Sequence, residues 1–249
     1  MSLFSRLFGS RDRGEGDLES RLEALEKEAR EARPGYVGSA YNRAGDLSLR
    51  HGLEGRALGF YGRAIDAFLE DSQREAARGV ANKIIRVRPT AVRALCTLTW
   101  LDLASRHQAM ALLHLRDYVS AARDAEEHAR TATQIHRMAS MSADEEFLNA
   151  VADALDSLDY GNRAREVRDW GAEGGPNHIE DEDALSRACV TAAITSNAAD
   201  AELLSDDMDG SDGREGADAV IAGWWVSTRG ASGPREPLEA GRTRSRWIS

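Results

Sequence analysis

The chain has 249 residues, a formal net charge of −10 and only 6% aromatic residues. The negative charge argues against nonspecific binding to DNA or RNA, which uses clustered Lys and Arg to neutralise phosphates. Two cysteines, Cys96 and Cys189, are too few for a disulfide framework and form no CxxC metal site, and no apolar run approaches the roughly 18 residues of a spanning helix. We therefore expect a soluble protein of the reducing cytoplasm.

Residues 1–16 are predicted to form a short amphipathic and flexible N-terminus. On a helix, four large apolar side chains would share one face, with a single cation opposite them. Such a face docks on a partner protein or on a membrane surface, and here its membrane affinity would be weak and reversible. The four residues are Leu3, Phe4, Leu7 and Phe8.

Residues 17–33 are predicted to form a helix that ends at Pro34-Gly35 and covers the first of the following helix pairs. Its apolar residues recur at helical spacing, with Glu and Arg around them. The apolar stripe consists of Leu18, Leu22, Leu25 and Ala29.

Residues 36–170 have the pattern of consecutive helices joined by short turns, and no segment of any length alternates as a strand would. Breaks near residues 52, 71–72, 89–90, 105 and 140–142 leave helices of roughly 12–18 residues, the layout of antiparallel helix pairs. Ser72 with Glu75 and Ser142 with Glu145 have the spacing of a capping box, so each pair predicts a helix start.

Small residues recur in this region at a spacing of 34. Gly45 and Gly79 are 34 residues apart, and so are Ala57 and Ala91, with Ala125 at the next step. A repeat of this length predicts one helix pair per copy.

The segment of residues 41–64 resembles the tetratricopeptide repeat of bacterial proteins. It has an aromatic residue, a small pair, a Gly turn, and then Ala, an aromatic residue and Ala. The resemblance implies an all-α fold, an α-α superhelix of three to four degenerate repeats over residues 17–170. Small and aromatic residues would pack the two helices of each pair together. The predicted repeat-packing residues are Tyr41, Gly45, Ala57, Tyr61, Ala64, Gly79 and Ala91.

The resemblance also implies a peptide-binding groove, because the first helix of each tetratricopeptide pair lines a concave surface. Polar residues of those helices that face away from the packing would contact the bound peptide. The family's clamp for a C-terminal carboxylate is not reproduced in this sequence. The predicted groove residues are Asn42, Asp46, Arg50, Lys83, Arg86, His107, Met110 and His114.

No catalytic motif is present, so we expect a protein that is not an enzyme and has no cofactor. The sequence lacks G-x-S-x-G, H-E-x-x-H and the phosphate-binding G-x-x-x-x-G-K-[ST]. His107 and His114 would share one helix face, but further ligands for a metal are missing, and no metal site is predicted.

Residues 171–249 are predicted to be a mostly disordered, acidic and Gly-rich tail, because they carry too little apolar surface to offset the entropy of ordering. Residues 184–204 could form a transient helix. The acidic run of residues 180–183 is one candidate to compete for the groove, by charge alone, and the apolar patch around Trp224-Trp225 is another.

The sequence therefore predicts a protein–protein interaction adaptor or scaffold that binds a peptide or helix of another protein, in an oligomeric state left open. The second interpretation is a peripheral assembly factor held at the inner face of the membrane by its N-terminal Leu/Phe segment. Neither interpretation involves nucleic acid.

Overall fold

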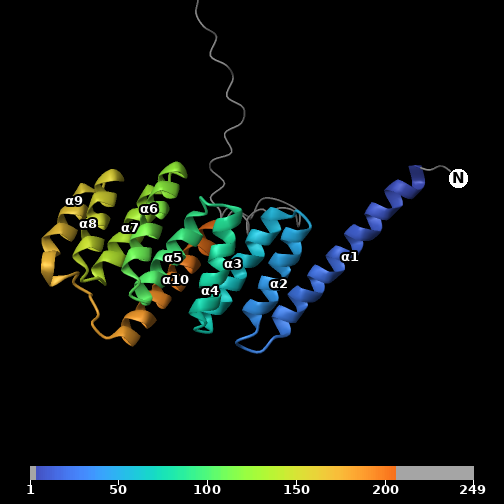
Figure 1. Ribbon diagram of the computed structural model, residues 1–249, viewed down its shortest axis with the longest axis horizontal. Helices are drawn as coiled ribbons and strands as arrows, with labels where there is room; N and C mark the ends of the chain where they lie inside the picture. The colour runs from blue at the N-terminus through green and yellow to red at the C-terminus, as the bar shows by residue number, and fades with distance from the viewer. Residues whose placement is uncertain (1–3, 206–249) are drawn as a thin grey trace, which may run out of the picture.

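The computed structural model describes residues 4–205, with side chains described for residues 16–171 and 173–195 (Figure 1). These residues form ten α-helices, one 3₁₀ turn and no strand, which confirms the predicted all-α class. Residues 1–3 and 206–249 lie outside the described part.

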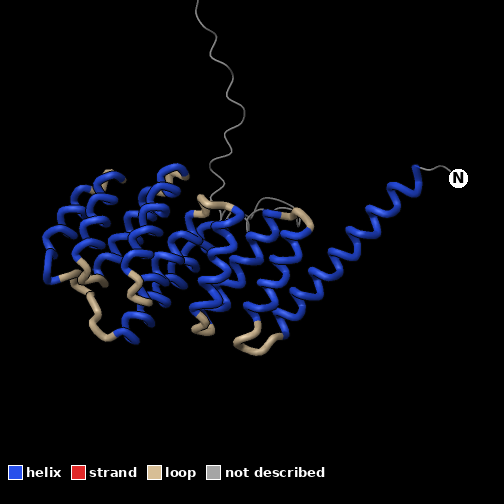
Figure 2. The backbone as a smooth tube through the Cα atoms, viewed as in Figure 1, coloured by secondary structure: helices blue, strands red, loops and turns tan. Residues whose placement is uncertain are grey.

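The helices follow one another closely. They are α1 (Phe4–Glu31), α2 (Val37–Arg50), α3 (Glu54–Glu70), α4 (Arg74–Val87), α5 (Val92–Ala104), α6 (Gln108–Asp124), α7 (His128–Ser140), α8 (Glu145–Ser157), α9 (Gly161–Trp170) and α10 (Glu182–Ser205), with the 3₁₀ turn η1 (Gly171–Glu173) after α9. Helices α2 to α9 lie in a row in chain order, α1 flanks α2 and projects beyond it, and α10 returns to the middle of the row (Figures 1 and 2).

Five of the turns in this row share one backbone geometry. Each contains one residue in the left-handed conformation. The backbone N–H groups of that residue and of the next one donate hydrogen bonds to carbonyl oxygens near the end of the preceding helix. At Ser72, for example, the N–H donates to Leu69 O at 3.0 Å, and the N–H of Gln73 donates to Phe68 O at 2.7 Å. This double closure is the Schellman motif, which favours Gly. The five left-handed residues are Gly52, Ser72, Arg106, Glu126 and Asp159. The sequence pattern missed the turns at 125–127 and 158–160, which contain neither Gly nor Pro.

The first helices of the four pairs bury residues at matching positions. The steps between α2, α4, α6 and α8 are 37, 34 and 37 residues, as the buried Ala40, Ala77, Ala111 and Leu148 show. Two further sets follow the same steps. They are Ala44, Ala81, Leu115 and Ala152, and Leu47, Ile84, Tyr118 and Leu155.

The constant spacing of 34 predicted from the small residues does not join equivalent positions. Ala57 lies inside α3, whereas Ala91 is the N-cap residue of α5 and Ala125 is the C-cap residue of α6.

The two predicted packing glycines behave differently. A Cβ on Gly45 would lie 2.5 Å from two ring carbons of Tyr61, so its missing side chain lets α2 approach α3. Gly79 is exposed, with no atom within 4 Å of the corresponding position, so the prediction that it packs the repeats is wrong. The remaining predicted packing residues are Ala57, Tyr61, Ala64 and Ala91, which are buried, and Tyr41, which is partly buried.

Both predicted capping boxes are wrong, because the N-cap residues of α4 and α8 are Gln73 and Asp144, one and two residues after the predicted Ser72 and Ser142. Ser72 occupies the left-handed position of its turn, and α4 begins only at Arg74. At α8 the N-cap is Asp144, whose Oδ1 accepts from the N–H of Phe147 at 2.7 Å. Ser142 instead accepts a hydrogen bond from the N–H of Asp144.

Helix α5 is buried along its entire length, because α4 and α6 flank it and α10 covers a further face. The covering face of α10 consists of Leu185, Ser186, Cys189, Ala192 and Ala193, all buried. Small residues at these positions let the two helices pack closely.

The prediction of disorder from residue 171 is therefore wrong for the described part of the tail, and the folded region does not end at residue 170. A Cβ on Gly175 would lie 2.4 Å from Ser140 O, and the N–H of Gly175 donates to Ser142 O at 2.8 Å. This segment thus runs against the α7–α8 turn. Arg74 then holds the start of α10 through the hydroxyl of Ser186. The ordering entropy is offset by apolar surface that α5 supplies, which the tail sequence alone does not reveal.

At the other end, the predicted flexible segment 1–16 is helical from Phe4 onward, as the first part of α1. Leu18, Leu22 and Ala29 are buried, as the predicted stripe requires. Leu3 lies outside the described residues, and for Phe4, Leu7 and Phe8 only the backbone is described. Among the described helices, none combines the length and apolar character needed to cross a membrane.

Candidate functional site

Polar side chains from three helices meet around the carboxylate of Asp46. Lys83 of α4 places its Nζ 2.6 Å from Asp46 Oδ1 and 2.9 Å from Asn42 Oδ1, and both acceptors lie on α2. The hydroxyl of Tyr61, on α3, donates to the same Asp46 oxygen at 2.7 Å. Lys83 also lies over the Tyr61 ring, with Nζ 5.4 Å from the ring centroid. We call Asn42, Asp46, Tyr61 and Lys83 the Asp46 cluster.

The repeat geometry explains why these residues meet. Asp46 and Lys83 are 37 residues apart, which is the step between α2 and α4, so they occupy equivalent positions on neighbouring first helices. Asn42 precedes Asp46 by one helical turn and therefore lies on the same face. Tyr61 reaches them because Gly45 opens the space between α2 and α3.

Two further cations stand beside this cluster. Burial and the hydrogen bond to Asp46 raise the pKa of Tyr61, while the charges of Arg86 and Arg50 act in the opposite direction, so both guanidinium groups lie within electrostatic range of the phenol. Arg50 and Arg86 are exposed, and neither has a carboxylate partner among the described residues. Within the described part of the chain, Arg50 Nε donates a hydrogen bond to the carbonyl oxygen of Asp46, at 3.2 Å. Their charges are thus available to a ligand.

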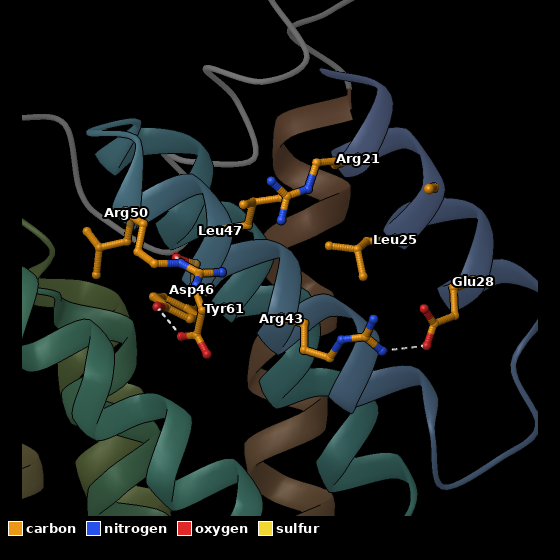
Figure 3. Close-up of a pocket in the computed structure, with 10 residues that line it drawn as sticks. Arg21, Leu25, Glu28, Arg43, Asp46, Leu47, Arg50 and Tyr61 are labelled. Atoms are coloured by element: carbon orange, nitrogen blue, oxygen red, sulfur yellow. Dashed lines mark hydrogen bonds and ion pairs between the residues drawn. The ribbon is translucent and has the colours of Figure 1, made fainter. Parts of the chain in front are cut away.

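An open cavity of about 860 Å³ extends from Asp46 and Tyr61 across α2 to α1 (Figure 3). Its lining alternates cations with apolar residues. Arg43 Nη1 lies 2.7 Å from Glu28 Oε1, so the charge of Arg43 is partly neutralised. Leu49, an apolar residue of the lining, is exposed. The lining residues are Arg21, Ala24, Leu25, Glu28, Arg43, Asp46, Leu47, Leu49, Arg50 and Tyr61.

The structure divides the predicted groove residues into two groups. Asn42, Asp46 and Lys83 touch one another, and Arg50 and Arg86 adjoin them. The three residues predicted on α6 do not join this site by any described contact. His107 is the exposed N-cap residue of α6, Met110 is 43% exposed, and His114 is turned to an internal partner.

That partner is Asp102, a fully buried carboxylate of α5. Its Oδ2 lies 2.6 Å from His114 Nδ1, and Arg78 of α4 contacts its Oδ1. Arg78 also donates to Leu101 O at 2.9 Å. Asp102 therefore joins three consecutive helices, and the prediction that His114 faces a bound peptide does not fit this geometry.

Sequence reasoning missed several residues of the site. Tyr61 was predicted only as a packing residue, although its hydroxyl belongs to the Asp46 cluster. Arg21 and Arg43 were not predicted at all, because the cavity depends on where α1 lies. Asp102 did carry a signal, since it is the one acid in the apolar run of residues 92–104.

The acidic run of residues 180–183 does not reach the Asp46 cluster. It precedes and begins α10, where Arg106 donates to the backbone oxygen of Glu180. A smaller cavity of about 380 Å³ lies at the same place, and Arg106, His178 and Cys189 are among the residues that line it. Within residues 4–205, the described side chains include no group of three His, Cys, Asp or Glu residues that could hold a metal ion.

No protein-family model matches this chain, and a search of curated proteins and of solved structures finds no significant match either.

Proposed function

We propose that this chain is a non-enzymatic adaptor with a tetratricopeptide-like solenoid, and that it binds an acidic segment of another protein across α1, α2 and α4. The observation that carries the proposal is the Asp46 cluster, flanked by Arg50 and Arg86, which have no carboxylate partner among the described residues. A row of helix pairs with matching buried positions supports the solenoid.

The charges around the cluster support an acidic ligand. Asp46 already receives Lys83 and the Tyr61 hydroxyl, so it adds little repulsion toward an incoming carboxylate. Arg50 and Arg86 can each form a two-pronged pair with a carboxylate. The exposed Leu49 and the partly buried Leu25 add apolar contact for neighbouring side chains of the ligand.

The test uses the full chain and a fluorescein-labelled peptide of alternating Glu and Gly, with binding followed by anisotropy. Arg50→Gln with Arg86→Gln should weaken binding roughly fivefold to tenfold, because two exposed charge pairs contribute about 1 kcal/mol together. The matched control is Arg116→Gln with Arg123→Gln, which removes two exposed cations of α6. If both double variants bind the peptide as the parent does, the site is not where we place it.

Partner identification follows from the same pair of variants. Proteins of the native cytoplasm that are retained by the parent and by the α6 control, but lost with Arg50→Gln and Arg86→Gln, are the candidates. A crosslink from such a protein to α2 or α4 then identifies a groove ligand.

A second candidate function is a peripheral assembly factor that docks on a membrane through Leu3, Phe4, Leu7 and Phe8. It is favoured by one observation, namely that α1 projects away from the row with its first residues farthest out (Figure 1). Deleting residues 1–9 should abolish sedimentation with anionic vesicles while leaving peptide binding unchanged. Vesicle binding that survives the deletion would remove this alternative.

A further inference from the structure

The chain's own sequence supplies an acidic segment directly after the last described helix. Residues 206–218 contain six acidic side chains and a single Arg. We infer that this segment occupies the groove of Arg21, Arg43, Arg50 and Arg86 in cis and competes with external ligands there. The inference rests on the proposed function, because both use the same groove.

The direction of α10 brings the segment to the correct edge of the row. Arg74, the first residue of α4, contacts Ser186 near the start of α10, so α10 begins at the edge where the α3–α4 turn lies. It then packs along α5 and α3 toward the opposite edge (Figure 1). That opposite edge carries the α2–α3 turn, and Arg50 is the last residue of α2.

Helix lengths place the end of α10 level with that turn. From Ser186 to Ser205, α10 rises about 28 Å, and the 17 residues of α3 span about 25 Å. A fully extended segment of 13 residues then reaches up to about 45 Å. Residues 206–218 are therefore long enough to pass from the end of α10 around the edge to the cavity between α1 and α2.

Charge complementarity selects this surface. Four cations, Arg21, Arg43, Arg50 and Arg86, face the cavity or the adjoining phenol of Tyr61. Among the described residues, the acids paired beside them are Glu28 with Arg43, Asp46 with Lys83, and the exposed Asp17, whose Oδ2 lies 4.0 Å from Arg21 Nη1. Arg50 and Arg86 have no carboxylate partner among these residues. A tethered segment has an effective concentration in the millimolar range, so even a weak site is occupied.

The first measurement detects the contact itself. A nitroxide on Ser211→Cys should broaden amide signals around Arg43 and Arg50 in the isotope-labelled full chain and leave those of α9 unchanged. The native thiols Cys96 and Cys189 are buried, so the label is directed to the introduced cysteine. The broadening should disappear with Arg50→Gln and Arg86→Gln, and at high salt, which screens exposed charges, but persist in the Arg116→Gln and Arg123→Gln control.

The second measurement detects competition. Replacing the six acids of residues 206–218 by Asn or Gln should tighten binding of the labelled Glu/Gly peptide roughly tenfold, which corresponds to a groove occupied about nine tenths of the time. Unchanged peptide affinity in that variant, or no broadening near Arg50, overturns the inference and leaves the proposed function standing.

Two further outcomes concern a groove that binds no external peptide and a segment that binds a second copy of the chain. If broadening near Arg50 is seen but the peptide binds neither the parent nor the neutralised variant, the segment occupies the groove in cis, whereas the competition with an external ligand and the proposed function both fail. If broadening arises only when labelled chains are mixed with separate isotope-labelled chains, the occupant is the segment of a second copy, and binding in cis is wrong.

Discussion

His114 Nδ1 lies 2.6 Å from Asp102 Oδ2, and the guanidinium group of Arg78 contacts the other oxygen of the same carboxylate. The three residues belong to α6, α5 and α4, and the Asp102 side chain is fully buried between the other two. A buried carboxylate is tolerated only where its charge and its lone pairs are satisfied. These contacts therefore join the second helix pair to the third.

Removing the carboxylate should destabilise the fold strongly. Asp102→Ala removes the buried counter-charge of Arg78 and leaves it only the exposed Glu75, whose Oε2 lies 3.6 Å from Arg78 Nε. We therefore expect the free energy of unfolding to fall by about 3–5 kcal/mol. Urea unfolding followed by circular dichroism measures the change. Asp117→Ala, at an exposed position of α6, is the matched control and should shift stability by less than about 0.5 kcal/mol. Equal effects of the two substitutions would show that the buried contacts do not stabilise the fold.

Gly45 and Gly79 should respond in opposite ways to the same substitution. Gly45→Ala places a methyl group 2.5 Å from the Tyr61 ring, and such overpacking costs about 1–3 kcal/mol. Gly79→Ala meets no atom within 4 Å and improves helix propensity by about 0.5–1 kcal/mol. Thermal unfolding of the two variants beside the parent decides the matter. A stabilised Gly45→Ala chain would mean that α2 and α3 are farther apart than described.

The buried thiol of Cys189 makes stability sensitive to alkaline pH. Burial raises its pKa from 9.0 to about 12, partly offset by the charge of Arg137. Above pH 9 the unfolded chain loses this proton and the folded chain keeps it, so the free energy of unfolding falls by about 1.4 kcal/mol per pH unit up to about pH 12.

Cys189→Ala removes this contribution. Between about pH 8 and about pH 10.5, the variant should lose about 2 kcal/mol less than the parent. Urea unfolding of both chains at the two pH values gives the comparison, and the other alkaline groups cancel because both chains share them. If the free energy of unfolding falls equally in parent and variant, the pKa of Cys189 is not raised by burial.

Shortening the chain before α10 should expose α5. A fragment of residues 17–173 lacks the covering face of α10, whereas a fragment of residues 17–205 keeps it. The free energy of unfolding of the shorter fragment should be several kcal/mol lower, and its exposed apolar surface should bind a hydrophobic dye. Urea unfolding of the purified fragments tests this. If the shorter fragment is as stable as the longer one, α10 contributes nothing to the core.

The sequence predicts the helices better than it predicts their exact ends. The stripe of Leu18, Leu22 and Ala29 identifies the covering helix because apolar spacing is a local property. The turns are harder, since Arg106, Glu126 and Asp159 adopt a left-handed conformation that usually favours Gly. At these positions the packing of the flanking helices overrides the local preference.

The sequence predicts contacts of the candidate site only where they depend on one helix face. Asn42 and Asp46 are one turn apart on one helix, so their shared face could be inferred. The contact between Asp46 and Lys83 follows a step of 37 residues, which the predicted spacing of 34 does not give. His114 could not be assigned in this way, because its partner Asp102 lies on another helix. The packing of α10 could not be predicted from its own sequence either. The sequence of α5 gives an indirect indication, because a helix that is apolar on all faces must be covered on every side.

The contact between Arg74 and Ser186, 112 residues apart, changes how the molecule unfolds. In an open array of helix pairs each unit touches only its neighbours, so terminal units fray one after another. Here the start of α10 is held to the start of α4, and α8 and α9 lie inside the closed loop between these two helix starts. Unfolding of α8 and α9 therefore requires either that the closed loop expands or that α10 dissociates from the row. The region from α3 to α10 should therefore melt as one cooperative unit, and fold more slowly than a row with only local contacts.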